Sequence, residues 1–414
     1  MKLAIFATKF PLISETFVIN QAIELQALGN EVSILCESVD PSGFIHDSIN
    51  NSDLKNKIIE LKPTNDNMLT RQVYNLKNIA KMCVTNRYKE LLSIVFDRNM
   101  TLNQKESLVN YLSKKDVDKL EFNSIICHFG TNGYLLTKLR ELGYLSGSIY
   151  VYFHGYELSR HAVLKKYTQQ YRKLFSSAEK MLPVCEHYKN ILINIGCPEE
   201  KIKVQKMGVN VEQFSFNRDK NINRDKLRLI QVGRLTEKKA IVDSIKAVIN
   251  VSNQMDVEFN IIGDGELRSD ALKLIEEYDA SNYIKLLGSM SQDNVNKMMD
   301  YSDILLLPSV TPSSGDTESI PVCLMEALSK GLLVISTNHS GIPELILNNK
   351  TGFTVEESDV DALSEKILLI SRLNDKEIIS YRERGRKACL ENHDNIKLNR
   401  ELFEFIGLND VKTI

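Results

Sequence analysis

The chain has 414 residues, more than one hydrophobic core usually supports, so we expect two domains of about 200 residues each. Its hydrophobic fraction of 43% and charged fraction of 26% are ordinary for a globular protein. No apolar run approaches the ~18 residues that would cross a bilayer, and the N-terminus has no signal-peptide pattern. We therefore expect any membrane contact to be peripheral.

The net charge of −2 hides an asymmetry between the two halves of the chain. Residues 1–205 carry 26 Lys and Arg against 21 Asp and Glu, whereas the remainder carries 26 against 33. A basic N-terminal half suits an anionic partner, such as a phospholipid surface or a lipid-linked phosphate acceptor. Scattered surface charge explains the same numbers equally well, and both interpretations stay open.

Seven cysteines are scattered along the chain without a Cys-x-x-Cys pair or zinc-ligand spacing. Such a set is typical of reduced core cysteine in a protein of the cytosol. We expect a cytoplasmic protein, with a peripheral position on the inner face of the membrane as a variant of that location.

The first half of the chain contains apolar runs that predict buried strands, at residues 2–8, 31–37, 124–130 and 148–155. The first crossover helix is expected over residues 17–29, with Gly29 at its end. Residues 66–121 are rich in lysine and place apolar residues at helical spacing. They predict an inserted helical pair that either covers the sheet or lies on a membrane surface.

The second half alternates strands and helices more regularly, with strands expected at residues 227–235, 257–265, 283–288, 303–309 and 332–337. This alternation predicts an α/β fold with doubly wound parallel sheets, in which ligands bind beyond the carboxyl ends of the strands. We expect an N-terminal domain over 1–205, a C-terminal domain over 206–390 and a last helix, 391–414, crossing back. The polar stretch 216–226 is the best candidate for a linker.

Two glutamates, Glu318 and Glu326, flank the expected start of a short helix in the second half. Pro321 suits the first helical position and Gly331 the residue just past the helix end. A helix N-terminus favours an anion such as phosphate, and carboxylates on either side could hold flanking hydroxyl groups. A nucleotide sugar has this layout of sugar hydroxyls, diphosphate and ribose hydroxyls.

Basic residues follow a neighbouring strand, where Gly233 and Arg234 precede Lys239 at the next helix start. Cations there oppose the helix dipole, which favours a bound diphosphate over a merely solvated helix start. His128 and His154 each follow an N-terminal strand. A lone histidine at such a place is more often structural, and His154 is the one expected to face the cleft.

The C-terminal half closely resembles glycosyltransferase family 4 over roughly residues 204–370, in the motifs ESIPVCLMEAL, GLLVISTNHSGIPELI, NNKTGFTV, VGRLTEKKA, IIGDGELR and DILLLPS. The N-terminal half is similar to the branch that builds colanic acid and other exopolysaccharides, in KFPLISETFV, CHFGTNG and FHGYELS. The resemblance implies a GT-B fold, with two Rossmann-like domains and the donor in the cleft between them. It also implies a retaining transfer from a nucleotide sugar that requires no metal or other cofactor.

Carried over by residue, the resemblance assigns Arg234 and Lys239 to the donor diphosphate and Glu326 to the ribose hydroxyls. It assigns Glu318 to the transferred sugar and His154 to a catalytic contact with that sugar. Further donor contacts are implied for Gly233 and for the backbone N–H groups of Ile320, Val322, Cys323 and Leu324. Candidates for the acceptor or sugar side are Ser14, Glu15, Thr16 and His128.

The chain departs from the family pattern at several positions. Ser319 and Ala240 stand where many relatives have glycine, and Glu157 stands where aspartate is common. The familiar glycine-rich donor loop of the N-terminal domain is replaced by KFPLISETF.

We therefore expect an enzyme, a hexosyltransferase that uses a nucleoside diphosphate sugar, with UDP preferred on family frequency. Its acceptor would be a glycan or lipid-linked saccharide of a surface polysaccharide or capsule, with no nucleic acid partner. A sugar-nucleotide epimerase or a non-catalytic scaffold of the same fold is the alternative. A nicotinamide-dependent oxidoreductase is disfavoured, because no Gly-x-Gly-x-x-Gly turn follows the first strand.

Overall fold

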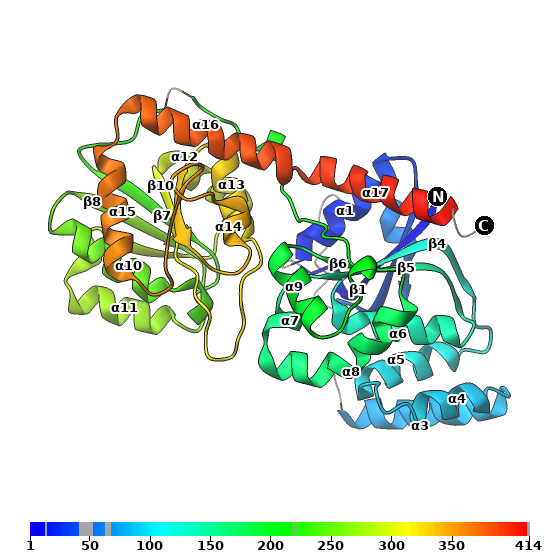
Figure 1. Cartoon of the computed structure of the whole chain (residues 1–414). Coiled ribbons are helices and arrows are strands. Elements are labelled where there is room, and N and C mark those ends of the chain that lie inside the picture. The colour runs from blue at the N-terminus through cyan, green and yellow to red at the C-terminus, as the bar shows by residue number, and fades with distance from the viewer. Residues whose placement is uncertain (13–14, 41–52, 63–67, 219, 412–414) are drawn as a thin grey trace.

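Two six-stranded parallel sheets organise the protein, one in each half of the chain, as a computed structural model shows (Figure 1). The structure describes residues 1–12, 15–40, 53–62, 68–218 and 220–411. The first sheet has the order β3-β2-β1-β4-β5-β6 and the strands β1 (Lys2–Phe10), β2 (Glu31–Val39), β3 (Ile58–Glu60), β4 (Leu120–Cys127), β5 (Leu145–Phe153) and β6 (Lys180–Pro183). The second has the order β12-β11-β10-β7-β8-β9 and the strands β7 (Leu227–Val232), β8 (Val257–Ile262), β9 (Ile284–Gly288), β10 (Ile304–Leu307), β11 (Leu333–Thr337) and β12 (Phe353–Val355).

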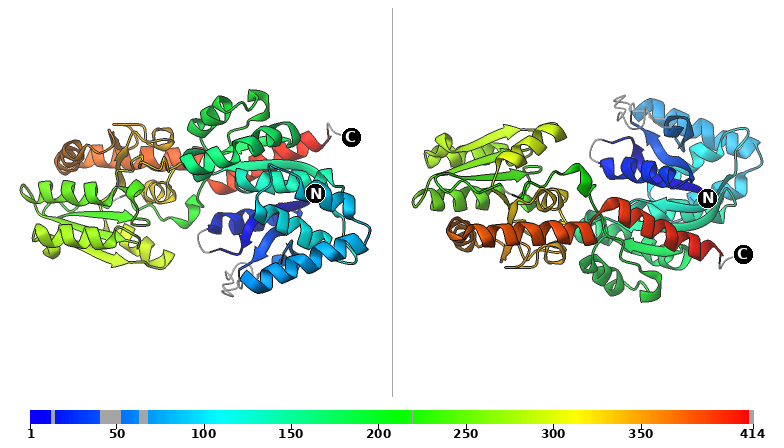
Figure 2. Two further views of the ribbon diagram at one scale, coloured as in Figure 1. Left: turned by 90° about the horizontal axis from the view of Figure 1, so that it is seen from below. Right: turned by 90° about the horizontal axis from the view of Figure 1, so that it is seen from above.

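Helices connect the strands and cover both faces of each sheet (Figures 1 and 2). The described helices of the first half are α1 (Thr16–Ala27), α3 (Met68–Val84), α4 (Tyr88–Val95), α5 (Leu102–Leu112), α6 (Gly130–Glu141), α7 (Tyr156–Ser159), α8 (His161–Ser177) and α9 (Glu186–Asn194). Those of the second half are α10 (Ile241–Ser252), α11 (Arg268–Glu277), α12 (Gln292–Tyr301), α13 (Val322–Lys330), α14 (Ile342–Leu345), α15 (Val360–Arg372), α16 (Asp375–Asn392) and α17 (Asn395–Val411).

Both sheets have the same doubly wound strand order. Each therefore contains one pair of neighbouring strands at which this order reverses, so that the connections after these two strands run to opposite faces of the sheet. In the first sheet this point lies between β1 and β4, and in the second between β7 and β10. Ligands of doubly wound sheets bind at such a point, beyond the carboxyl ends of the strands. The loops after β1, β4, β7 and β10 are therefore where a site is expected, and the sequence motifs fall in these loops.

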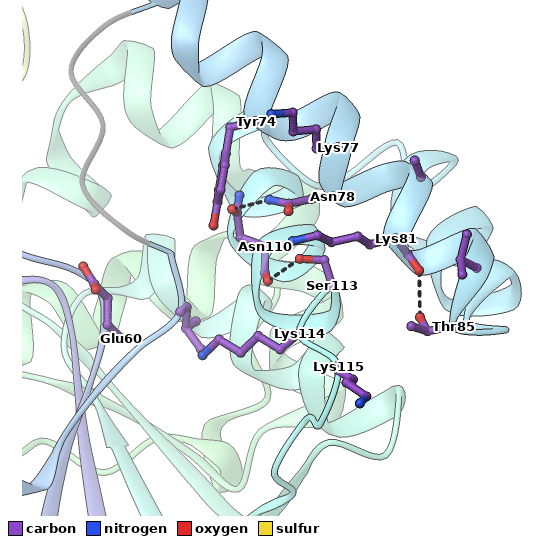
Figure 3. A pocket seen from close by; sticks show the side chains of 13 residues that line it. Glu60, Tyr74, Lys77, Asn78, Lys81, Thr85, Asn110, Ser113, Lys114 and Lys115 are labelled. Atoms are coloured by element: carbon purple, nitrogen blue, oxygen red, sulfur yellow. Dashed lines mark hydrogen bonds between the residues drawn. The ribbon is translucent and has the colours of Figure 1, made fainter.

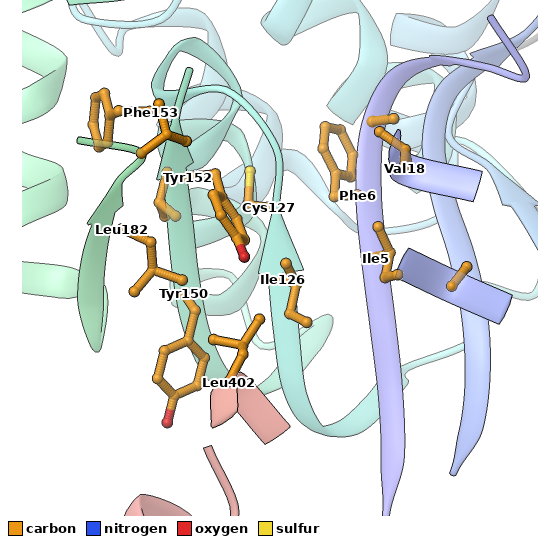
Figure 4. Packing of buried hydrophobic residues seen from close by; sticks show 14 of the residues in the cluster. Ile5, Phe6, Val18, Ile126, Cys127, Tyr150, Tyr152, Phe153, Leu182 and Leu402 are labelled. Carbon is orange, nitrogen blue, oxygen red and sulfur yellow. The ribbon is translucent and has the colours of Figure 1, made fainter. Parts of the chain in front are cut away.

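The strands form because their apolar side chains are buried on both sides. The central segments of β1 and β10 and the C-terminal half of β5 are almost continuously buried, as parallel strands covered by helices on both faces require. Figure 4 shows this packing in the first domain, where Leu402 of α17 lies close to Tyr150 of β5. The last helix is thus part of the N-terminal core, although its sequence follows the C-terminal domain.

Two segments of the chain pass between the domains side by side. The first contains Gly208 and Val209, and the second is the junction of α16 and α17, two helices that run across both domains in succession (Figures 1 and 2). The N–H of Val209 donates to the carbonyl of His393 at 2.9 Å, and the N–H of Asn395 donates back to Val209 at 3.0 Å. A Cβ on Gly208 would lie 2.4 Å from the His393 carbonyl oxygen, so only glycine allows this close crossing.

Three details differ from the sequence-based expectations. The linker prediction for residues 216–226 is wrong, because Arg382 donates to backbone carbonyls of Asn217 at 2.5 Å and Arg218 at 3.4 Å and so holds the segment on the C-terminal domain. The inserted helical pair consists of three helices, α3, α4 and α5. Pro321 is the residue before α13 rather than its first residue, while Gly331 ends that helix in the left-handed conformation as predicted.

Candidate functional site

The C-terminal side of the candidate site is an ion-paired cluster in the loops after β7 and β10. The Lys239 ammonium lies 3.2 Å from the Glu318 carboxylate, and Lys238 lies 3.5 Å from the same oxygen. Lys239 also lines the turn after β7, where a Cβ on Gly233 would be 3.3 Å from its side chain. The structure therefore brings together Gly233, Lys239 and Glu318, which the sequence separates by up to 85 positions.

Burial and charge act in opposite directions within this cluster. Burial alone would raise the pKa of Glu318, but the neighbouring ammonium groups of Lys239 and Lys238 outweigh it and hold the pKa below its ordinary value. Burial would likewise lower the pKa of Lys239, yet the Glu318 carboxylate raises it, against a smaller opposing effect of Arg234. Glu318 and Lys239 are therefore both ionised near neutral pH, and Arg234, whose side chain is exposed, lies close enough to act electrostatically on Lys239.

The backbone of Glu318 is held by a second interaction. Its N–H donates to Nε2 of His339 at 2.9 Å, and Nδ1 of that histidine lies 2.6 Å from Glu357. Because Nε2 accepts, the proton of the neutral ring must be on Nδ1, where the Glu357 carboxylate accepts it. His339 therefore fixes the peptide from which Glu318 projects.

Glu326 occupies the second turn of α13 and accepts a hydrogen bond from Gln292 at 2.9 Å. Burial raises the pKa of Glu326, with the Gln292 bond acting in the opposite direction. Burial also raises the pKa of Cys323 to about 11, and that thiol is affected electrostatically by Lys239, Glu326 and Glu318. The Cys323 thiol therefore lies close to Lys239, Glu326 and Glu318, the charged residues that the sequence analysis had assigned to the donor.

The first turn of α13 contributes backbone donors to the same place. A helix leaves its first N–H groups without intrahelical acceptors, and Val322 and Cys323 occupy this turn. The N–H of Leu324 already donates to the carbonyl of Pro321 at 3.1 Å, so it is not a free donor for a ligand. Ile320 precedes the helix in a buried position.

On the N-terminal side, the structure pairs two histidines that the sequence analysis had treated separately. His154 Nε2 lies 3.0 Å from His128 Nδ1, directly beyond the ends of β5 and β4. Burial lowers the pKa of His128 to about 3 and that of His154 well below its ordinary value, so both rings are neutral near pH 7. The buried carboxylate of Glu157 accepts the N–H groups of His154 at 2.7 Å and Gly155 at 3.0 Å, which fixes the loop carrying His154.

The loop after β1 reaches the same histidines. Phe17 at the start of α1 packs against His154 with the ring centroids 4.9 Å apart. Its neighbours Glu15 and Thr16 begin the helix beside it, and burial raises the pKa of Glu15 to about 7. Ser14, the remaining candidate from this loop, lies outside the described residues.

The two sides of the site meet through the loop that follows β10. Thr317, next to Glu318, contacts the Tyr188 hydroxyl at 3.1 Å, and a Cβ on Gly155 would lie 2.8 Å from that hydroxyl. In the same loop Asp316 accepts a hydrogen bond from Arg160 of the N-terminal domain at 2.7 Å. The loop carrying His154 and the loop carrying Glu318 are thus separated by a single tyrosine side chain.

Two of the sequence departures have different structural consequences. Ala240 adopts the left-handed conformation with φ +47°, ψ +46°, which glycine would adopt with less strain. Ser319 is not among the described non-glycine residues with positive φ, so a serine is accommodated there without that strain.

Several neighbours of the site were not identified from the sequence. Lys238 is adjacent to a predicted residue, and Asp316 and His339 lie in loops at the carboxyl edge, a position that could have signalled them. Glu357 lies at the same edge, just beyond the carboxyl end of β12, whereas Tyr188 lies in α9 and had no such signal. Within the described ranges, no group of three or more His, Cys, Asp or Glu side chains is arranged to hold a metal ion.

A separate cavity of about 740 Å³ lies in the N-terminal domain between α3, α5 and the end of β3. Lysines from both sides surround it, and Lys81 and Lys114 extend toward the space between these elements (Figure 3). Asn78 and Asn110 are joined across it by a hydrogen bond of 2.7 Å. The cavity is thus mostly apolar inside with a basic edge.

Comparison with known proteins gives a consistent result. Residues 212–388 match the family model "Glycosyl transferases group 1". The chain is 33% identical over 406 residues to WcaL of Escherichia coli K12, named provisionally as a colanic acid biosynthesis glycosyltransferase, covering 97% of this chain and 98% of that one. It is 34% identical over 375 residues to the amylovoran biosynthesis glycosyltransferase AmsK of Erwinia amylovora, covering 90% and 91%.

Solved structures share the fold at low sequence identity. A glycosyltransferase from Rickettsia africae superposes with a TM-score of 0.68 at 18% identity, covering 100% of this chain and 99% of the other. HepE of Anabaena, solved with UDP and glucose, superposes with a TM-score of 0.68 at 14% identity, covering 98% and 99%. These matches confirm the predicted GT-B fold class.

Proposed function

The chain belongs to the group 1 family of glycosyl transferases, and from this premise we propose its donor, its acceptor and the roles of its site residues. As a glycosyltransferase related to enzymes of colanic acid and amylovoran synthesis, it transfers a sugar. The proposed donor is a nucleoside diphosphate sugar with UDP as the nucleotide and a hexosyl-type sugar. The proposed acceptor is a glycan or lipid-linked saccharide of a surface polysaccharide.

The observation that carries the donor proposal is the ionised cluster of Lys238, Lys239 and Glu318 beside the start of α13. The cluster also includes Asp316, which lies 3.4 Å from Lys238 and 2.7 Å from Arg160. Four cations, Lys238, Lys239, Arg160 and Arg234, thus face two carboxylates, so the cluster retains positive charge that a diphosphate would neutralise. Arg234 and the N–H groups of Val322 and its neighbour Cys323 add donors to the same place. Such an arrangement favours an anion with several oxygens.

The remaining roles follow from position around the diphosphate. Glu326, one turn farther along α13, is proposed to bind the ribose hydroxyls, and its partner Gln292 would orient the carboxylate. Glu318 and His154, on loops separated only by Tyr188, are proposed to contact the transferred sugar from opposite domains. Because Glu318 is held ionised by two lysines, we assign it to binding sugar hydroxyls rather than to donating a proton.

The proposed reaction retains the configuration of the anomeric carbon. The bond from that carbon to the diphosphate oxygen breaks, a bond to an acceptor hydroxyl forms, and the hydroxyl proton passes to the departing diphosphate. Negative charge grows on the leaving group, where Arg234, Lys238 and Lys239 stabilise it electrostatically. These cations supply the charge stabilisation that a metal ion supplies elsewhere, so we propose that transfer needs no metal and that chelation with EDTA leaves the rate unchanged.

Donor binding is tested by calorimetric titration of UDP-, GDP- and ADP-sugars. In the double variant Arg234→Ala/Glu326→Ala, affinity for the preferred donor should fall by more than about a hundredfold, because a diphosphate cation and the ribose contact are both removed. The matched control is Arg218→Ala/Glu383→Ala, which removes an exposed arginine and glutamate of the same domain. Unchanged affinity in the first variant would refute the assigned donor site.

For location, we propose a cytoplasmic enzyme that lies peripherally on the inner face of the membrane. No described helix is long and apolar enough to span a bilayer. The helices α3 and α4 and the residue after α4 instead expose apolar side chains, each more than half exposed: Leu76, Val84, Leu92 and Phe96. Exposed lysines accompany them, and such a surface is typical of proteins that bind anionic lipids.

The basic cavity between α3 and α5 adjoins this surface and supports an anionic, lipid-linked acceptor. Sedimentation with vesicles that contain anionic phospholipid tests the membrane proposal. Leu92→Glu/Phe96→Glu should reduce the bound fraction several-fold, whereas Leu272→Glu, at an exposed apolar position of α11, should not. Equal sedimentation of all three proteins would contradict it.

A further inference from the structure

A continuous chain of hydrogen bonds leads from the last helix of the protein to His154. Gln21 of α1 donates from Nε2 to Oδ1 of Asn399 at 2.8 Å, and its Oε1 lies 3.0 Å from Nε2 of His128. Nδ1 of His128 then lies 3.0 Å from Nε2 of His154. His154 is half-buried, and the other side chains of this chain of hydrogen bonds are buried. Asn399 lies 378 positions from Gln21 in the sequence.

The carboxylate of Glu24 determines the direction of every bond in this chain. It accepts from the amides of Asn395 at 2.6 Å and of Asn399, so Asn399 must turn its Nδ2 toward Glu24 and its Oδ1 toward Gln21. An Oδ1 can only accept, so Gln21 must present Nε2 to it and Oε1 to His128. Each amide orientation is therefore fixed by its neighbour.

The same argument continues through the two imidazole rings. His128 meets an acceptor, Gln21 Oε1, so its single proton is on Nε2 and its Nδ1 is an acceptor. That Nδ1 in turn requires the proton of His154 to be on Nε2. Both rings are neutral near pH 7, because burial lowers their pKa values, so each carries only one proton.

We propose that α17 fixes the tautomer of His154, so that its Nδ1 is an obligate hydrogen-bond acceptor for a hydroxyl group of the substrate. No described residue donates a hydrogen bond to this Nδ1. Gln21, His128 and Asn399 are then positioning residues, which act on the sugar only through His154. The substrate part of this inference rests on the proposed function, whereas the tautomer assignment stands independently of it.

Asn399 is the residue that makes the orientation unique. Gln21 Nε2 also lies 3.2 Å from the hydroxyl of Tyr152, which can either donate or accept. Without Asn399, Gln21 could turn its amide by 180° and still bond Tyr152. His128 would then carry its proton on Nδ1 and donate it toward His154, which would reverse the tautomer of both rings.

Nitrogen NMR of the full-length protein with ¹⁵N-labelled histidine measures these tautomers directly. The signals of His128 and His154 are identified as those lost in His128→Gln and His154→Gln. In the wild-type protein both rings should be protonated on Nε2. The change Asn399→Leu should produce a mixture with a comparable amount of the Nδ1-protonated form.

Asn395→Leu is the matched control, because it removes an amide of α17 from the same Glu24 carboxylate but leaves Gln21 and Asn399 in contact. It should keep the wild-type tautomer. Unfolding midpoints and far-UV circular dichroism establish that both variants remain folded. A wild-type His154 protonated on Nδ1, or an unchanged spectrum in Asn399→Leu, would overturn the proposal.

Turnover separates this inference from the proposed function. Asn399→Leu should lower kcat by about twofold, because about half of the molecules keep the tautomer that accepts the substrate hydroxyl, while Asn395→Leu stays near wild type. A reversed tautomer with unchanged kcat would show that Nδ1 accepts no substrate hydroxyl. Absence of transfer by the wild-type enzyme would instead count against the proposed donor and acceptor and leave the NMR result intact.

Discussion

Replacement of Lys239 by methionine should separate the structural role of the charged cluster from its role in donor binding. Removing one partner of a buried ion pair costs about 3–5 kcal/mol because the other charge is left unpaired. Here Glu318 retains Lys238 at 3.5 Å and is partly reached by solvent, so we expect a loss of about 2 kcal/mol in the free energy of unfolding. For a domain of this size that corresponds to a decrease of roughly 4–8 °C in the unfolding midpoint.

The loss should depend on pH with a definite sign. In the wild-type protein the pKa of Glu318 lies below its ordinary value of 4.5, so the stabilisation by the lysines is fully present at neutral pH and is lost only as the pH falls through this lowered pKa. In Lys239→Met the burial of Glu318 is less opposed, so its pKa should rise. The deficit of the variant should therefore be smaller at pH 5 than at pH 8.

A second substitution tests the reasoning. Lys239→Met/Glu318→Gln leaves no unpaired carboxylate and should recover most of the unfolding free energy. Transfer should remain reduced by about 10²–10³, because the cation opposite the leaving group is still absent. Thermal unfolding and initial-rate measurements at both pH values provide the data. A single variant as stable as wild type at pH 8, or a double variant no more stable than the single one, would refute this account of the cluster.

Four further substitutions test local features of the fold. Ala240→Gly should increase the free energy of unfolding by about 1 kcal/mol, measured by denaturant titration, because the position has φ +47°. Gly263→Ala should lower it far more than Gly288→Ala: both have positive φ, but the new Cβ would lie 1.9 Å from the Gly233 carbonyl oxygen in the first and meet open space in the second. Burial raises the pKa of Glu157 to about 7, so the free energy of unfolding should decrease between about pH 4.5 and 7 by up to about 3 kcal/mol. Glu157→Gln should flatten that part of the stability profile, measured by urea unfolding across the pH range.

The alternation of short apolar runs and amphipathic segments was sufficient to predict two doubly wound sheets, because local hydrophobic periodicity determines which segments become strands. It also predicted the carboxyl-edge positions of Glu318, Lys239 and His154, because each lies in a segment that connects the carboxyl end of a strand to the next α-helix. The polar composition of residues 216–226 was misleading, since Arg382 from a distant helix satisfies carbonyls of this segment.

Contacts that depend on how the domains dock could not be predicted from local patterns. The Arg160–Asp316 pair joins residues 156 positions apart, and the Gln21–Asn399 bond joins residues 378 positions apart. Nothing in the sequence near Gln21 distinguishes it from other polar residues of an amphipathic helix. Only the return of α17 to the first domain gives Gln21 a partner and connects it with His128.

The most direct test of the account is mass spectrometry of the products formed from an isotopically labelled nucleotide sugar and a polysaccharide-derived saccharide acceptor. The account predicts that the labelled sugar appears on the acceptor with its anomeric configuration retained, that free nucleoside diphosphate is released in equal amount, and that Arg234→Ala/Glu326→Ala abolishes both. Recovery of an isomerised donor with no labelled acceptor, or transfer that survives in the double variant, would contradict it.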